Sequence, residues 1–279
     1  MVRFTVLVLG VPSKIQLQFI PVFIVCFLAS LLGPLCGIGG GVIIKPIVDA
    51  MGVMSVSAVS FLSSISALVM SHSTLTQNAV SRQSEIDTRS MVPIAVGSAV
   101  GGVFGKAVFN QLGTVLPDTE LVGAVQAAIL IALSLTVLIY TLNKSRIRGL
   151  MLERAAAQAS IGFLAGACWS FLGIGGGPFN LAILVFFFSM ESKPAAQPSL
   201  FIIAFSQTAS LVFTLATGSV PAFSPVVLIG MAAMAVLGSV VGRRLLRHMD
   251  SSAVDRLYIF ALVLIMVICA YNLVRFTAL

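Results

Sequence analysis

The 279-residue sequence carries little charge: 9% of its residues are Asp, Glu, Lys or Arg, whereas 58% are hydrophobic. A soluble globular protein of this length needs more polar surface, since charged residues cover much of its outside. The sequence also lacks a polar stretch long enough for an extramembrane domain. Together with a mean hydropathy of +1.10, these absences predict a single transmembrane domain over residues 1–279.

Other absences exclude further classes of protein. The four cysteines lie in apolar segments and form no CxxC pair, so neither a metal site nor a disulfide framework is expected. The net charge of +7 comes without a clustered basic face or aromatic platform, which excludes nucleic acid as a partner. No aspartyl dyad or GxSG turn lies in the apolar segments, and we therefore expect no enzyme and no cofactor.

The hydrophobic residues form eight apolar segments, many near or above the ~20 residues that span a bilayer. They cover approximately 19–51, 53–80, 91–111, 119–142, 155–190, 194–217, 224–247 and 253–276. A GIGGG run interrupts the first and fifth segments, beginning at Gly37 and again 136 positions later at Gly173. The motif GGVFGK at 101–106 is likewise answered by GSVVGR at 238–243. The spacing predicts an internal duplication, with one repeat at about 19–142 and the other at about 155–276.

The basic residues predict how these repeats cross the membrane, because Lys and Arg in short loops mark the cytoplasmic side. The central linker contains Lys144, Arg146, Arg148 and Arg154, and RRLLRH at 243–248 marks a second cytoplasmic loop. The two linkers can lie on the same side of the membrane if the segment 155–190 enters from the cytoplasm, turns at the glycine run and returns to the cytoplasm. We therefore predict an all-α integral membrane protein with two inverted repeats, each a glycine-broken, re-entrant helix pair plus three transmembrane helices. Arg148 and Arg247 are predicted to lie in the cytoplasm. Arg3 and Lys14 would lie outside, which is an exception to the positive-inside rule.

Broken helices near the membrane midplane are typical of secondary transporters. Half-helices predicted to begin at Pro178 and near Val42 direct unpaired N–H groups toward the turns, where they attract anions. The predicted substrate-binding glycines are Gly37, Gly39, Gly40, Gly41, Gly173, Gly175, Gly176 and Gly177. The alternative is close helix packing, which we prefer for GGVFG and GSVVG.

The two glycine motifs carry a family resemblance. GPLCGIGGGVIIKP in the first half and LGIGGGPFN in the second resemble the paired motifs of the TauE/SafE sulfite exporter family, also called TSUP. The resemblance covers nearly the whole chain. It implies transport of sulfite, sulfonates such as sulfoacetate, or other small organic acids, often outward across a bacterial inner membrane. The second motif has Leu181-Ala182 where the first has Lys45-Pro46.

Hydroxyl and amide side chains inside the spans are further candidates, because polar groups in lipid usually face a pathway or a partner helix. Ser63, Ser66, Ser71 and Thr74 fall near one helical face, and at the repeat spacing Ser63 answers to Ser199 and Ser71 to Gln207. We predict that Ser63, Ser199 and Gln207 bind substrate. Alternatively, the serines bond carbonyls of their own helix.

Three more side chains are singled out. Lys45 is predicted to bind substrate by supplying charge to the anion, the alternative being that it extends to the interface. Asn180 is predicted to bind substrate, and together with Trp169 it flanks the second turn and closes over the site. His72 is the single histidine within a span and is a proton-coupling candidate or a structural residue.

These observations predict a secondary transporter that exports a small organic or sulfur-containing anion bound at the paired glycine turns. The alternative is an uncoupled anion channel or uniporter. The expected partners are a small anion and the lipid bilayer of the cell membrane, which the chain crosses several times. The substrate, the coupling ion and whether the protein is a homo-oligomer stay open.

Overall fold

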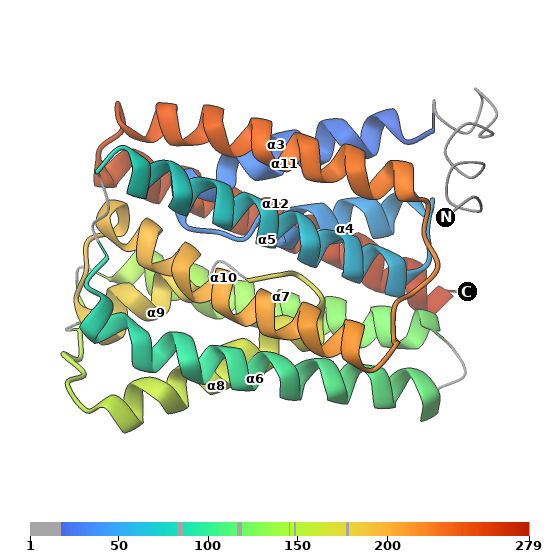
Figure 1. Ribbon diagram of the computed structural model, residues 1–279, viewed down its shortest axis with the longest axis horizontal. Helices are drawn as coiled ribbons and strands as arrows, with labels where there is room; N and C mark the ends of the chain where they lie inside the picture. The colour runs from blue at the N-terminus through green and yellow to red at the C-terminus, as the bar shows by residue number, and fades with distance from the viewer. Residues whose placement is uncertain are drawn as a thin grey trace.

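The computed structural model describes residues 18–82, 86–115, 119–144, 146–147, 149–176 and 179–278, and regular structure within these ranges is helical throughout. The helices, labelled as in Figure 1, are α3 (Ile20–Cys36), α4 (Gly41–Met51), α5 (Val56–Val80), α6 (Thr88–Val115), α7 (Thr119–Asn143), α8 (Ala155–Leu172), α9 (Phe179–Phe188), α10 (Ser192–Ala216), α11 (Pro225–Leu246) and α12 (Ser251–Ala278). Seven of them, namely α5 to α8 and α10 to α12, are long and apolar enough to cross a membrane. The all-helical transmembrane prediction is thus confirmed.

Both predicted glycine breaks are present and use the same stop signal. Helix α3 ends where Gly37 adopts a φ of 60°, and α8 ends where Gly173 adopts a φ of 63°. Such left-handed C-caps favour glycine because it has no Cβ. Helix α4 begins at Gly41 and α9 at Phe179. Gly177 and the predicted helix start at Pro178 lie outside the described residues.

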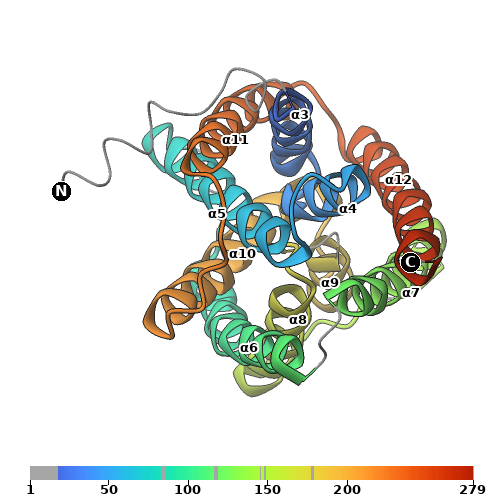
Figure 2. The same cartoon turned by 90° about the vertical axis from the view of Figure 1, so that its right-hand side faces the viewer.

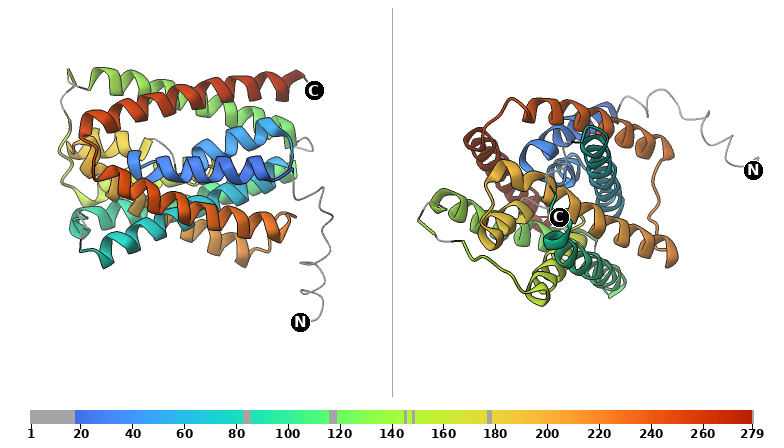
Figure 3. Two further views of the ribbon diagram at one scale, coloured as in Figure 1. Left: turned by 90° about the horizontal axis from the view of Figure 1, so that it is seen from above. Right: turned by 60° about the vertical axis from the view of Figure 1, so that its left-hand side comes forward.

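The two broken pairs approach the interior from opposite ends of the bundle. Figures 1 and 3 show α3 and α4 both reaching the end at which α12 finishes, while α8 and α9 both reach the other end. At that end the N–H groups of Leu150 and Leu152 donate to the carbonyls of Phe186 and Phe187, which fixes the end of α9 beside the start of α8. Figure 2, which looks along the bundle, shows α4 and α9 in its interior.

The basic loops gather at the end of the bundle where α8 begins. Lys144 forms an ion pair with Asp255, and Ser192 donates a hydrogen bond to the same carboxylate. Lys193 donates to the carbonyl of Met249. These contacts place the central linker, the start of α10 and the loop after α11 together, as predicted for the two basic linkers. Arg148 itself lies outside the described residues. We call this the basic end.

Helix packing accounts for the second pair of motifs, as predicted. Along α6, a Cβ at Gly101 or Gly105 would lie 2.0 Å from the carbonyl oxygens of Phe163 or Ala167 in α8. Along α11, a Cβ at Gly242 would lie 2.1 Å from the carbonyl oxygen of Leu31 in α3. Because no real Cβ approaches backbone so closely, GGVFG and GSVVG allow α6 to pack on α8 and α11 on α3.

Candidate functional site

The two glycine turns lie directly against each other in the protein interior. A Cβ at Gly39 would lie 2.5 Å from the carbonyl oxygen of Gly176, and one at Gly41 would lie 2.2 Å from that of Ile174. Residues 37–41 and 173–176 are all buried. The sequence repeat therefore brings together two turns that are 136 positions apart, and their contact consists of backbone atoms. We call it the glycine contact.

Ser63 and Ser199 hold the glycine contact by reciprocal hydrogen bonds. The hydroxyl of Ser63 on α5 donates to the carbonyl of Gly173 at 2.8 Å, and that of Ser199 on α10 donates to the carbonyl of Gly37 at 2.5 Å. Each serine thus bonds the turn of the other half. A hydroxyl has one proton to donate, so neither serine can donate to an anion while these bonds persist.

The glycine contact is closed to an anion in this conformation. Backbone carbonyls of Ile174, Gly175 and Gly176 fill the space beside Gly39 and Gly41, and a carbonyl oxygen repels an oxyanion. The N–H groups of Val42 and Ile43 already donate to the carbonyls of Gly39 and Gly40. An anion can reach the N–H groups of the glycines only after the turns separate, and binding there stays a prediction.

A large basic pocket leads from the basic end toward the first turn. Its volume is about 460 Å³, and it is lined by Pro34, Thr74, Asn78, Arg82, Lys193, Gln197, Leu200, Arg243, Leu246 and Arg247. Four of these described residues are cationic, and none carries a carboxylate. At its inner side, Pro34 lies three residues before Gly37, and Leu200 follows Ser199. We call this pocket the vestibule. Sequence reasoning missed it because it used the arginines of RRLLRH as topology markers alone.

Comparison with known families identifies the chain. Residues 22–270 match the model of the family described as "Sulfite exporter TauE/SafE", which covers most of the sequence. The chain belongs to the TauE/SafE family. This TauE/SafE protein is accordingly a multi-pass membrane transporter, and its family is not one of enzymes. Separate comparisons with curated proteins and with solved structures gave no match.

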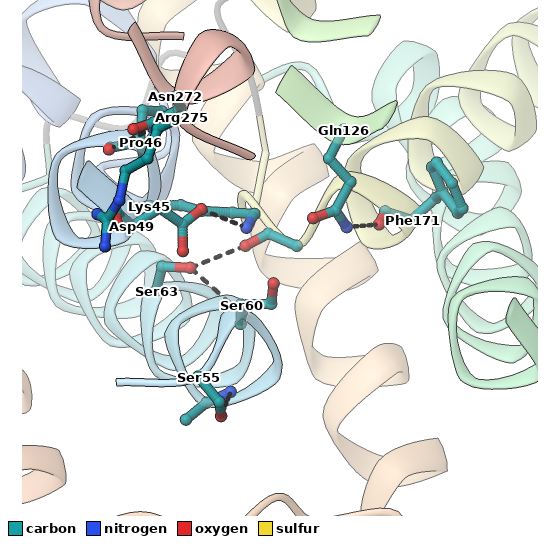
Figure 4. A network of polar contacts seen from close by, with 12 residues as sticks. Lys45, Pro46, Asp49, Ser55, Ser60, Ser63, Gln126, Phe171, Asn272 and Arg275 are labelled. Carbon is teal, nitrogen blue, oxygen red and sulfur yellow. Dashed lines mark hydrogen bonds and ion pairs between the residues drawn. The ribbon is translucent and has the colours of Figure 1, made fainter. Parts of the chain in front are cut away.

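Lys45 of this TauE/SafE protein lies in an ion pair. Its ammonium donates to the Asp49 carboxylate at 2.7 Å, and both side chains are about 95% buried (exposed fractions 4% and 5%). Figure 4 shows this pair on α4 beside Asn272 and Arg275 of α12, which donate to backbone carbonyls of α4. Lys45 therefore neither extends to the interface nor offers an uncompensated charge here. The spacing of four residues was a signal for this pair that sequence reasoning missed.

Asn180 and Trp169 lie together beside the second turn, as their positions predicted. The indole N–H of Trp169 donates to the amide oxygen of Asn180 at 2.8 Å, and the Trp169 ring stacks on Phe179. These contacts join the end of α8 to the start of α9. They fix how the chain leaves the turn on either side of the break.

His72 does not join the other predicted site residues. It is exposed, and its Nδ1 lies 3.1 Å from the carbonyl oxygen of Leu68. It lines a groove of about 710 Å³ with residues of α5, α6 and α10, and this groove shares Asn78 with the vestibule. Neither the vestibule nor the glycine contact includes it. Its role in proton coupling stays a prediction without support from this geometry.

Gln207 lines a narrow cavity that the vestibule does not include. The cavity measures about 20 Å³ and is lined by Phe61, Ser64, Ile65, Leu68, Lys106, Ser170, Gln207, Ser210, Leu211 and Thr214. Its residues come from α5, α6, α8 and α10. We call it the narrow cavity.

Proposed function

We propose that this protein is a secondary transporter that exports a small organic or sulfur-containing anion, such as sulfite, a sulfonate or sulfoacetate. The vestibule is the observation that carries the proposal. It combines four cationic side chains with a lining that includes Pro34, three residues before the first glycine turn. A cleft lined by one sign of charge between low-dielectric walls concentrates ions of the opposite sign.

The polar groups of the vestibule suit an oxyanion. Asn78 accepts a hydrogen bond from the Arg243 guanidinium, which holds that side chain toward α5. Thr74 and Gln197 add a hydroxyl and an amide to the lining. The Thr74 hydroxyl donates to the carbonyl of Met70, so the groups that match the oxygens of a sulfite or sulfonate are the planar guanidinium groups. The apolar walls at Pro34 and Leu200 exclude part of the water that would otherwise screen these charges.

We infer that the basic end faces the cytoplasm, since the loops that gather there carry most of the basic residues. In the proposed arrangement each half is one broken helix pair followed by three long helices, which makes the halves inverted repeats. The opposite approach of α3–α4 and α8–α9 supports this arrangement (Figure 1). The vestibule is then the entry for an anion that leaves the cell.

The glycine contact is the proposed gate and, once opened, the proposed binding site. The closed contact favours alternating access over an open channel, because backbone atoms of the two turns pack directly against each other. Separating the turns breaks the reciprocal serine bonds, each contributing about 1 kcal/mol. Such small terms allow the closed and open states to interconvert.

Flux measurements in proteoliposomes test the proposal. We expect the purified protein to move sulfite or sulfoacetate down its gradient at a rate that saturates with concentration. A pH or sodium gradient that drives uphill movement would establish coupling. A rate that rises linearly with concentration and ignores both gradients would favour the channel alternative. The absence of flux for every small sulfur oxyanion and organic acid tested would overturn the proposal.

A further inference from the structure

Lys106 is a buried cation with no anionic partner among the residues that the structure describes. Its side chain lies in the narrow cavity with 7% of the residue exposed, and its ammonium is 4.9 Å from the centre of the Phe109 ring. Within the described part of the chain, no carboxylate lies within ion-pair distance of it. Buried charges in proteins are normally paired because their desolvation is costly. The aromatic ring attracts the ammonium without neutralising its charge.

Neutral hydrogen-bonding groups line the same cavity as this cation and are also incompletely bonded. Gln207 is 2% exposed, and neither its amide nitrogen nor its amide oxygen has a partner among the described residues. The hydroxyls of Ser170 and Ser210 share one hydrogen bond at 2.6 Å, which leaves one of their two protons for another acceptor. A positive charge with two unused donors beside it favours an oxyanion as the missing partner.

The narrow cavity corresponds to the vestibule through the sequence repeat. Lys106 and Arg243 end the matched motifs GGVFGK and GSVVGR. Four further pairs of lining residues, one from each cavity, match at the 136-residue spacing. They are Ser64 with Leu200, Ser170 with Pro34, Ser210 with Thr74, and Thr214 with Asn78. Each cavity is thus lined by the residue three positions before a glycine turn, Pro34 or Ser170, and by corresponding helices, and each contains a cation at the matched position.

The two cavities differ in size rather than in construction. The vestibule measures about 460 Å³, whereas the narrow cavity measures about 20 Å³, which is room for about one water molecule. We propose that Lys106, Gln207 and the Ser170–Ser210 pair form a second anion-binding site, closed here, which binds the transported oxyanion at the end opposite the vestibule. This inference rests on the proposed transport function. The single cation and the unused donors fit a sulfite ion or a sulfonate head group.

The test compares the two sides of the membrane with sulfite as the probe. The full chain is reconstituted in one orientation, and the half-saturating sulfite concentration is measured from each side. Lys106→Gln is expected to raise the value at the end opposite the vestibule by about ten-fold relative to the value at the basic end, since a charge-assisted hydrogen bond is lost. Arg243→Gln is expected to change the same ratio in the opposite direction. Lys106→Arg keeps the charge and should stay near the wild-type ratio.

Each outcome decides one claim. If the wild-type protein transports sulfite but folded Lys106→Gln keeps the wild-type ratio of half-saturating concentrations, the second site is overturned and the proposed function is not. A wild-type protein that moves no candidate anion overturns the proposed function, and the second site with it. If thermal unfolding shows that Lys106→Gln does not fold, Gln207→Leu must shift the ratio in the direction expected for Lys106→Gln, and a failure to do so overturns the site.

Discussion

At the residue scale, the glycines of the GIGGG motifs are required for different steric reasons. Gly39 and Gly41 leave room for carbonyls of the opposite turn, whereas the nearest atom to a Cβ at Gly40 would be the Ser30 hydroxyl at 3.3 Å. Gly176 differs again, since its φ of 109° strains any other residue. The run GIGGG is therefore a set of distinct steric requirements, and substitutions within it should not behave alike.

Alanine substitutions at neighbouring glycines test the gate. Gly41→Ala places a methyl group 2.2 Å from the Ile174 carbonyl oxygen, so we expect the turns to stay apart and coupled transport to be lost. Gly40→Ala is the matched control and should retain more than about half of wild-type transport, because its contacts begin at 3.3 Å and small shifts relieve them. Flux and thermal unfolding are measured together. Equal transport by the two variants would contradict a gate at this contact.

Sequence reasoning at this scale identified the repeat equivalence of Ser63 and Ser199 but not their partners. Which carbonyl a buried hydroxyl bonds depends on how the two halves dock, and a linear repeat does not encode that docking. Lys106 was missed for a related reason, since it ends a motif whose glycines serve helix packing. Its unpaired state becomes visible only when the surrounding α8 and α10 are in place.

At the scale of elements, the short helix α4 is anchored by charge. Lys45 and Asp49 pair within it, and Arg275 and Asn272 tie its carbonyls to α12 (Figure 4). The corresponding positions of α9 are apolar, with Leu181 in place of Lys45 and Val185 in place of Asp49. The first broken pair thus has a polar attachment at a position where the second has apolar packing.

Breaking this pair should destabilise the protein strongly. Lys45→Met leaves the Asp49 carboxylate buried and unpaired, at an expected cost of about 3 kcal/mol or more. The double variant Lys45→Met with Asp49→Leu removes both charges and should recover most of that loss. Thermal unfolding of the purified single and double variants provides the measurement. A single variant as stable as wild type would show that the ion pair is not structural. Normal transport by the double variant would show that Lys45 is not a substrate ligand, contrary to the prediction from the sequence.

At the scale of the whole molecule, the described helices follow the predicted apolar segments to within a few residues. This success reflects a strong physical constraint, because every backbone polar group in lipid must be bonded within a helix. The sequence could not reveal which of two matched cavities is wide. The matched positions carry a cation in both cavities, and the width of each cavity depends on how the surrounding helices pack.

Labelling of single cysteines tests the proposed orientation. In a background without Cys26, Cys36, Cys168 and Cys269, Arg146→Cys and Arg247→Cys should be protected from a membrane-impermeant maleimide added to intact cells. Ser219→Cys, in the exposed loop between α10 and α11, should be labelled. Arg146 and Arg247 both lie in loops at the basic end, so labelling of just one of them would contradict the arrangement. The reverse pattern at all three positions would show that the protein has the opposite orientation in the membrane, with the vestibule facing outward.

The glycine contact has a consequence for the leakage of protons and small ions through the protein. A barrier made of side chains can be titrated, oxidised or eroded by a single substitution, whereas this one is made of main-chain atoms and two serine hydroxyls. The side chains that also pack on the turns, such as Ile203 and Ala67, are neither titratable nor readily oxidised. The tightness of the barrier toward protons and small ions should therefore be insensitive to pH and redox state, although a substitution that adds volume at a glycine, such as Gly41→Ala, should open it. Changes in the charged lining of the vestibule can then alter which anion is accepted without making the membrane permeable, so that selectivity and insulation can evolve separately.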